Sequence, residues 1–406
     1  MHPIHILPNG IKLVHKYIDA PISHFGVLLN AGTRDEKPEY SGLAHFVEHT
    51  IFKGTQKRNS GQVIRYMENV GGEINASTSK EETYFHASFL SSDSERAIEL
   101  LSDIFFHATF PEKELIKEKD VILEEINYYN DTPSELIFDD FETLIYDTHP
   151  LGNNILGTKK SLQKISRQAI VEFIAQNYTA QNVVLSYVGQ FSELKMIHLC
   201  TKYFGQQPMN KSERIRGKFE QYTPKTVFKK KKTAQAHLVM GNIAYPLFHE
   251  NRYPLMLLSN LLGGQGLNTR LNLAVREKKG LAYSVEANYN PFSDSGLFTI
   301  YVGCDNNLVE KCTQIIHKEL KKLRDQKLGT LQLHYAKKQF LGQLAISNES
   351  KLNEMLAIGR SALFFDEIET LEEAIHSFES ITSQTLLEVA NEILVPDLFT
   401  TLLFHK

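Results

Sequence analysis

The first half of the chain alternates between strand-like and helix-like spacing of its apolar residues. Apolar and polar positions alternate in "IKLVHKY" (11–17) and "HFGVLLNAG" (24–32), which predicts two strands. A helix is expected over "SGLAHFVEHTIF" with Ser41 as its N-cap, and a second from Ser60 to the pair Gly71-Gly72. Extended structure, a helical stretch up to about residue 146 and the apolar strand "QNVVLSYVGQF" complete a mixture of strands and helices.

The second half repeats this order of elements. "AQAHLVMGNIAYP" is similar to "SHFGVLLNAGTR", and the apolar helix "YPLMLLSNLLGG" takes the place of the one that carries histidines. A polar stretch with two prolines lies between the halves, over residues 205–225. We therefore predict a duplicated chain with an N-terminal domain over 1–210, a linker over 211–225 and a C-terminal domain over 226–406.

Composition narrows the class of protein without identifying it. The 406 residues are 42% hydrophobic and 23% charged, and the formal net charge of −4 gives no reason to expect nucleic acid or an anionic membrane as partner. No apolar run has the length of a signal peptide core or a membrane span. The three cysteines, Cys200, Cys304 and Cys312, are far apart and lack CxxC spacing, which excludes a disulfide framework. We expect a cytoplasmic protein.

The candidate chemistry begins at "HFVEH", residues 45–49. On a helix that turns about 100° per residue, Glu48 lies about 60° to one side of His45, and His49 about 40° to the other. Two imidazoles at i and i+4 can chelate one zinc ion, and the glutamate on the same face can act as a base toward a metal-bound water. The order H-x-x-E-H is the inverzincin signature. With 16 histidines in the chain, a chance match to ordinary core or surface histidines remains an alternative.

A third ligand is expected from the helix "EKDVILEEINYYND". Around Glu125, Val121 falls at about −40° and Ile122 at about +60°, so Glu125 is predicted to face inward, with Glu118 at about +20°. Glu124 falls about 100° away, toward charged neighbours. A carboxylate on an inward stripe requires a cation or several donors, and a zinc ion on the two histidines would satisfy Glu125. Glu118 would then orient a ligand. The alternative is that both glutamates pair with lysines on a solvated face.

These segments resemble a known family. "NAGTRDE", "GLAHFVEHTIFKGT", "ENVGGEINASTSKEETYF", "EKDVILEEI" and "HPLGNNILG" look like consecutive blocks of the pitrilysin/insulinase class of zinc metallopeptidases, in the small-subunit branch similar to mitochondrial processing peptidase. The resemblance covers nearly the whole chain. It implies that Zn²⁺ is bound by His45, His49 and Glu125, since the family's ligand glutamate lies some seventy-odd residues after the second histidine. It implies the base role for Glu48 and an outer role for Glu118.

The resemblance also extends to the second half. "GGQGLNTRLNLAVREKKGLAYSV" is similar to the block in which an arginine and a tyrosine assist catalysis, and these fall on Arg276 and Tyr283. A guanidinium can hold a substrate carbonyl or carboxylate, and a phenol can donate to a developing oxyanion. The glycines at 263, 264 and 266 depart from the family's run of three, so only a flexible loop is expected there. Without the resemblance, Arg276 and Tyr283 would be ordinary surface and strand residues.

The segment "GGEINASTSK" looks like the family's substrate-binding edge strand, on which Asn75 and Ala76 line the cleft. An extended peptide would add to this strand through main-chain hydrogen bonds. The alternative is an ordinary edge strand without a ligand.

Taken together, the resemblance implies an α+β fold of two homologous domains, each an antiparallel-rich mixed sheet with helices packed on one face. It implies a zinc-dependent endopeptidase or oligopeptidase that acts on peptides or unfolded segments, and a homodimer that encloses a shared chamber. Two alternatives stay open: a non-catalytic scaffold subunit of the same fold, and a zinc-binding peptide receptor that does not cleave.

Overall fold

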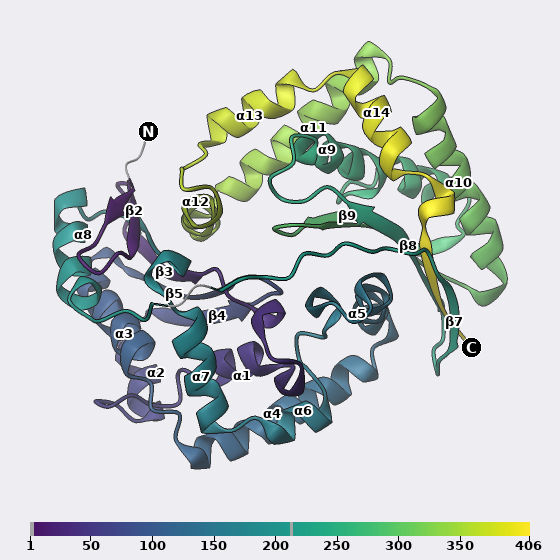
Figure 1. The fold of residues 1–406 in the computed structure, drawn as a ribbon. Helices are drawn as coiled ribbons and strands as arrows, with labels where there is room; N and C mark the ends of the chain where they lie inside the picture. The colour runs from purple at the N-terminus through teal and green to yellow at the C-terminus, as the bar shows by residue number, and fades with distance from the viewer. Residues whose placement is uncertain (1–3, 212–213) are drawn as a thin grey trace. The chain divides into compact units, whose positions relative to one another are not determined.

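The computed structural model describes residues 4–211 and 214–406, which form two compact units (Figure 1). The first unit comprises the chain up to residue 126 together with 153–216 and 346–370. The second comprises 127–152, 217–345 and 371–406. The units are therefore not the contiguous domains 1–210 and 226–406 that the sequence predicted. Each half of the chain contributes one segment to the unit that the other half builds.

The first unit contains a six-stranded sheet. Its strands lie in the order β1-β2-β6-β3-β5-β4, and only β2 and β6 pair in parallel. Their bounds are β1 His5–Ile6, β2 Lys12–Tyr17, β3 Ile22–Leu29, β4 Glu73–Thr78, β5 Thr83–Leu90 and β6 Val183–Gly189. The strands predicted over 11–17 and 24–32 are confirmed as β2 and β3, and β2 pairs with β1 across a turn in which Gly10 has φ +92°.

The second unit contains a five-stranded sheet with the same topology. Its order is β7-β11-β8-β10-β9, with β7 and β11 parallel and the other neighbours antiparallel. The strands are β7 Thr226–Lys230, β8 Ala236–Ala244, β9 Ala282–Pro291, β10 Gly296–Cys304 and β11 Thr400–His405. The match of strand order and direction to β2-β6-β3-β5-β4 confirms the predicted duplication and the antiparallel-rich mixed sheets.

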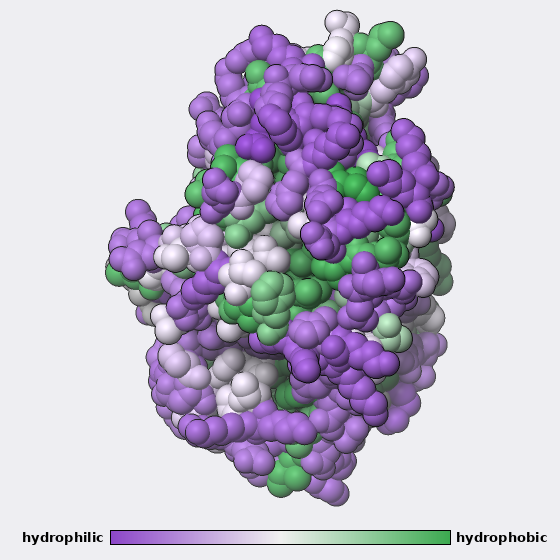
Figure 2. Space-filling view, turned by 90° about the vertical axis from the view of Figure 1, so that its right-hand side faces the viewer, coloured by the Kyte–Doolittle hydropathy of each residue, from purple (hydrophilic) through white to green (hydrophobic). Residues whose placement is uncertain are grey.

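Helices occupy most of the remaining described chain. Those of the first half are α1 Leu43–Thr50, α2 Ser60–Glu68, α3 Ser94–His107, α4 Glu112–Asn130, α5 Pro133–Tyr146, α6 Lys159–Lys164, α7 Arg167–Asn177 and α8 Glu193–Cys200. Those of the second half are α9 Arg252–Gly263, α10 Val309–Asp325, α11 Thr330–Asn348, α12 Lys351–Phe365, α13 Leu371–Ser380 and α14 Ser383–Ile393. None of these helices is both long enough and apolar enough to span a membrane. On the face drawn in Figure 2, hydrophilic side chains cover most of the surface.

Two helices, α5 and α12, pack on the sheet built by the other half of the chain. In the first unit, Met355 and Ala362 of α12 pack against Leu28 of β3 and Val184 of β6. Successive strand residues point to opposite faces, and Phe25 of β3 instead lies 5.9 Å from the ring of Phe204. The first sheet thus has helical cover on both faces, where the sequence had predicted one.

The second sheet has the equivalent cover from α5. Ile137 and Phe141 form a buried cluster with Val239 of β8 and with Leu402 of β11. Because the two halves are duplicates, α5 and α12 are equivalent helices that have exchanged sheets.

Candidate metal centre

Helices α1 and α4 bring together the three predicted ligands. The Nε2 atoms of His45 and His49 lie 3.7 and 3.6 Å from Oε2 of Glu125. One ligand atom from each residue can be chosen so that all three lie within 4.8 Å of one another. A tetrahedral zinc with ligand bonds of about 2.0–2.1 Å separates its ligand atoms by roughly 3.4 Å. Two nitrogens and a carboxylate oxygen at these separations fit a zinc ion, with one coordination position left open.

The ring of His49 is held by residues outside the ligand set. Its Nδ1 lies 3.0 Å from Oε1 of Glu118, and Lys53 donates to the other oxygen of that carboxylate at 2.7 Å. The remaining ring nitrogen, Nε2, faces Glu125 and is available to a metal. Lys53 lies beyond the end of α1, so the helical spacing that located the histidines gave no sign of it.

The environment keeps one histidine neutral and favours charge on the other. Burial, together with the neighbouring His49, lowers the pKa of His45 to about 3. Burial also opposes protonation of His49, but its hydrogen bond with Glu118 and the charges of nearby carboxylates outweigh this and raise its pKa. The pKa of Glu118 is lowered, because its hydrogen bonds with His49 and Lys53 exceed the effect of burial. A neutral His45 beside anionic carboxylates is the protonation state that a divalent cation needs.

Glu48 lies on α1 between the two histidines in sequence but outside the ligand cluster. Burial raises the pKa of its carboxyl group, and the negative charge of Glu125 raises it further. A carboxylate with a raised pKa accepts and returns a proton near neutral pH more readily than an exposed one. This environment agrees with the predicted role of a base.

The position of Glu125 on α4 follows from the helix, although one step of the prediction was wrong. The buried residues include Glu118, Ile122 and Ile126, which centre the inward stripe about 60° from Glu125. Glu125 therefore lies at the edge of the stripe and is half-buried. Val121 was expected to be buried. It lies on the other side of Glu125 from the buried stripe and is 51% exposed. Glu124 is exposed, as predicted.

Glu36, which no pattern in the sequence indicated, caps the helix of the two histidines. Glu36 accepts hydrogen bonds from the backbone N–H groups of Gly42, at 2.8 Å, and Ala44, at 2.7 Å. Gly42 has φ +91° and provides no side-chain cap, and α1 begins at Leu43. The predicted N-cap Ser41 thus precedes the actual N-cap residue. Burial raises the pKa of Glu36 well above its usual range, against the effect of the two backbone hydrogen bonds.

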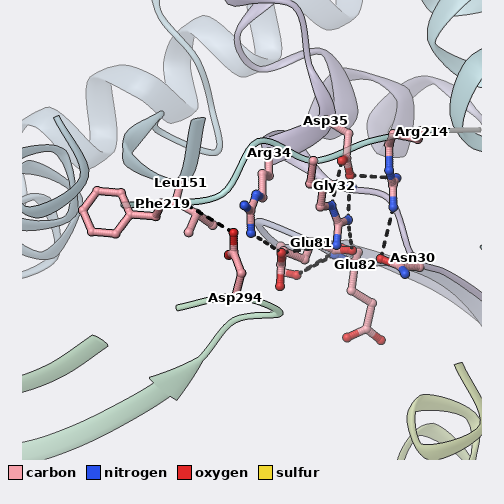
Figure 3. Close-up of polar contacts among 12 residues, drawn as sticks. Asn30, Gly32, Arg34, Asp35, Glu81, Glu82, Leu151, Arg214, Phe219 and Asp294 are labelled. Carbon is pink, nitrogen blue, oxygen red and sulfur yellow. Dashed lines mark hydrogen bonds and ion pairs between the residues drawn. The ribbon is translucent and has the colours of Figure 1, made fainter. Parts of the chain in front are cut away.

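Buried ion pairs hold the segment before Glu36 (Figure 3). Asp35, whose side chain is 1% exposed, lies 3.0 Å from Arg214 and 2.8 Å from Arg216. Arg34 pairs with Glu81 at 2.7 Å. Both Arg214 and Arg216 fall in the predicted linker 211–225. This part of the linker is therefore bound to the first unit.

Asn75 and Ala76 lie on β4, the terminal strand of the first sheet. They pair with His86 and Phe85 of β5, so one backbone edge of β4 has no neighbouring strand in the described chain. The side chain of Asn75 is exposed. The prediction of an edge strand is confirmed.

Arg276 and Tyr283 belong to the second unit, whereas the three ligands belong to the first. Arg276 lies on the π-helix η7, Asn272–Glu277, with Nε 3.8 Å from a carboxylate oxygen of Glu277. Tyr283 lies on β9, is 59% exposed and donates to Asp305 at 3.4 Å. Their side chains are thus on the surface of the second unit.

The duplicated fold and the H-x-x-E-H helix together define a class of protein. Comparison of the sequence with models of known protein families identifies that class. Residues 13–159 match the family model for insulinase (peptidase family M16), and residues 164–340 match the model for the peptidase M16 inactive domain. The first match contains all the proposed zinc-site residues, and the second contains Arg276 and Tyr283. The chain belongs to peptidase family M16.

Relatives extend over almost the whole chain. It is 35% identical to "Uncharacterized zinc protease YmxG" of Bacillus subtilis, over 96% of this chain and 95% of that one. It is 30% identical to an "Uncharacterized zinc protease" of Rickettsia felis, over 95% and 93%. A crystal structure of a protease from Helicobacter pylori superposes with a TM-score of 0.92 at 23% identity, over 100% of both chains. That structural likeness concerns the fold.

Proposed function

We propose that the protein is a zinc-dependent endopeptidase or oligopeptidase that hydrolyses peptides or unfolded segments. The observation that carries the proposal is the convergence of His45, His49 and Glu125, with Glu48 on the same helix and outside the ligand set. Zinc bound there would acidify a water molecule and polarise a substrate carbonyl. The names of the relatives agree with this class of activity. A cytoplasmic location belongs to the proposal and is supported by three cysteines that are all free.

Residues of the protein carry out proton transfer, orientation of a ligand and substrate binding. Glu48 takes a proton from the attacking water, holds it on its carboxylate and passes it to the leaving amine nitrogen. Glu118 and Lys53 fix the ring of His49, so that Nε2 stays directed at the site. The open edge of β4, at Asn75 and Ala76, binds the substrate as an added strand.

Tyr283 donates a hydrogen bond to the substrate carbonyl oxygen as it gains negative charge, and Arg276 holds a neighbouring substrate carbonyl or carboxylate. We assign both to a site shared across a homodimer, in which the second unit of one subunit faces the zinc of its partner.

Hydrolysis of an internally quenched fluorogenic peptide, with and without a zinc chelator, tests the proposal. We expect turnover that is lost with chelator and restored by added zinc. A non-catalytic scaffold or a peptide receptor would release no fluorescence under either condition, and that result would overturn the proposed activity.

A matched pair of variants on α4 tests the ligand set separately from turnover. Glu125→Gln removes a charged ligand, so metal content measured by elemental analysis should fall well below one zinc per chain. Glu124→Gln removes the same charge from an exposed neighbour and should leave the metal content near wild type. Equal loss of metal in both variants would mean that Glu125 is not a ligand.

A further inference from the structure

A cavity of about 340 Å³ in the second unit has four cationic side chains among its nine lining residues. Arg270, Lys278, Lys322 and Lys327 line it, and Glu319 is the only acidic residue among the lining. Lys322 pairs with that glutamate at 2.5 Å. One carboxylate therefore faces four cations. A hollow surrounded by excess positive charge attracts small anions.

Arg270 is the strongest single indication of a ligand. Its side chain is half-buried, and this burial lowers its pKa despite the opposing charge of Glu319. Within residues 4–211 and 214–406, Arg270 has no ion pair or side-chain hydrogen bond. Partial burial removes some of the water around its five donors, so an acceptor inside the cavity would bind there favourably. An anion in the cavity would supply the acceptor oxygens.

Uncharged donors complete the lining. The side chain of Gln332 accepts a hydrogen bond from the backbone of Gly329 at 3.1 Å through Oε1, which leaves its amide nitrogen to donate. Gln326 adds a second amide to the wall. The volume is at the small end of the range for ligand sites. Several cationic and amide donors around a small hollow suit the tetrahedral, oxygen-rich groups of phosphates.

We propose that this cavity binds a small phosphate anion with more than one negative charge, of the size of pyrophosphate. The ligand bridges three elements of the second unit. Leu273, Ala274 and Lys278 come from η7 and the residue after it, Glu319 and Lys322 from α10, and Gln332 from α11. Binding should therefore stabilise the packing of η7 on α10. The proposal concerns the second unit and does not depend on peptidase activity.

Isothermal titration calorimetry and thermal unfolding of the full-length protein test it without any peptide substrate. The probes are pyrophosphate and glycerol phosphate, with sodium chloride at equal ionic strength as the baseline. We expect saturable binding and a rise in melting temperature with at least one probe and not with chloride. Tighter binding of pyrophosphate would assign an inorganic diphosphate to the site, and tighter binding of the ester an organic phosphate. No saturable binding of either would overturn the proposal.

Variants locate the binding. Arg270→Gln should weaken the affinity about tenfold, the usual effect of losing one charge-assisted hydrogen bond. The double variant Lys278→Gln/Lys327→Gln changes only exposed side chains and covers the case in which Arg270→Gln does not fold. Lys318→Gln removes one positive charge from an exposed residue of α10 that does not line the cavity, and should bind as wild type. Affinity unchanged by Arg270→Gln and by the double variant, or equally weakened by Lys318→Gln, would place the anion elsewhere and refute the site.

Discussion

Glu48 and His49 of α1 have different proposed roles, proton transfer and zinc binding, and substitution of each residue can separate these roles. Glu48→Gln should keep its zinc, because Glu48 is not in the ligand cluster, but should lose turnover by about 10²–10⁴-fold since the base is gone. His49→Ala should lose both zinc and turnover. Elemental analysis of zinc content and peptide hydrolysis kinetics of both variants measure these effects. If Glu48→Gln lost zinc as readily as His49→Ala, the separate roles would be refuted.

Glu36 does not bind the metal itself. It fixes the N-terminus of the helix that carries both histidines. In Glu36→Gln, one of the two acceptors becomes an NH₂ group that opposes a backbone N–H. We expect zinc affinity to weaken about tenfold, as for other outer residues of metal sites, and the unfolding free energy to fall by about 1–2 kcal/mol. Chelator competition and urea unfolding measure the two effects.

A matched control is the cap of α6, where Thr158 accepts from the backbone N–H of Ser161 at 3.0 Å. Thr158→Ala should lose about 1 kcal/mol of stability and leave zinc affinity unchanged. Equal weakening of zinc binding in Thr158→Ala and Glu36→Gln would show that general destabilisation, and not the position of α1, sets the affinity.

The residues of the site that sequence could predict are those related by helical spacing. His45, Glu48 and His49 share one face at i, i+3 and i+4, and Glu125 follows from the resemblance and from its helix. Lys53 and Glu36 could not be found in this way. They act through tertiary contacts between a loop and a helix. The periodic pattern of apolar residues in the sequence does not show which loop contacts which helix. The exposed Val121 shows that a wheel built on three residues can misplace the centre of a buried stripe.

At the scale of elements, the exchange of α5 and α12 was beyond the reach of the sequence. The segment of α5 was predicted as part of a helical stretch of the first half, and the segment of α12 was placed in the C-terminal domain without a prediction of its structure. The two sheets are duplicates with similar apolar faces, so an amphipathic helix carries no pattern that selects one sheet over the other. The succession of strands and helices along each half, in contrast, was predicted from the repeated pattern of apolar residues. The fold class was therefore predictable, and the membership of the two units was not.

The docking of α12 on its sheet depends on small residues at closest approach. A Cβ atom at Gly359 would lie 2.8 Å from Cδ2 of Leu28 and 3.0 Å from Cβ of Ser186. Leu28 is fully buried, so it has no free space into which to move. Gly359→Ala should lower the unfolding free energy by about 1–3 kcal/mol through overpacking, as measured by urea denaturation.

Gly342 on α11 is the matched control, because a Cβ there meets nothing within 4 Å. Gly342→Ala should raise the unfolding free energy by about 0.5–1 kcal/mol, since alanine favours the helix over the unfolded chain. A loss of stability at Gly342 similar to that at Gly359 would mean that α12 does not pack as described.

At the scale of the whole molecule, the two duplicated units differ in the candidate site residues that they carry. The first unit carries the proposed zinc ligands, and α9 of the second unit presents mostly buried apolar residues in the equivalent helix. The match to the M16 inactive domain model covers residues 164–340, most of which lie in the second unit, and includes Arg276 and Tyr283. Tyr283 is largely exposed on its own unit, which leaves its phenol available to another surface. We therefore expect the active site to be completed by a second copy of the chain.

Mixed dimers test this shared site. Homodimers of Glu48→Gln should be almost inactive, and homodimers of Tyr283→Phe should be impaired. If Tyr283 serves the partner's zinc, a mixed dimer contains one site with both residues intact and one site lacking both. Exchanging subunits should then restore activity to about half the wild-type value in the mixed dimers.

A site built from residues of a single chain predicts a different activity for the mixed dimers. If Glu48 and Tyr283 act on the zinc of their own chain, neither site of a mixed dimer is complete, and activity cannot exceed the mean of the two parents. Native mass spectrometry of differently tagged subunits confirms that exchange has occurred. Peptide turnover that stays at or below the parental mean after confirmed exchange would exclude the shared site, whereas turnover well above it requires that each zinc be served by residues of both chains.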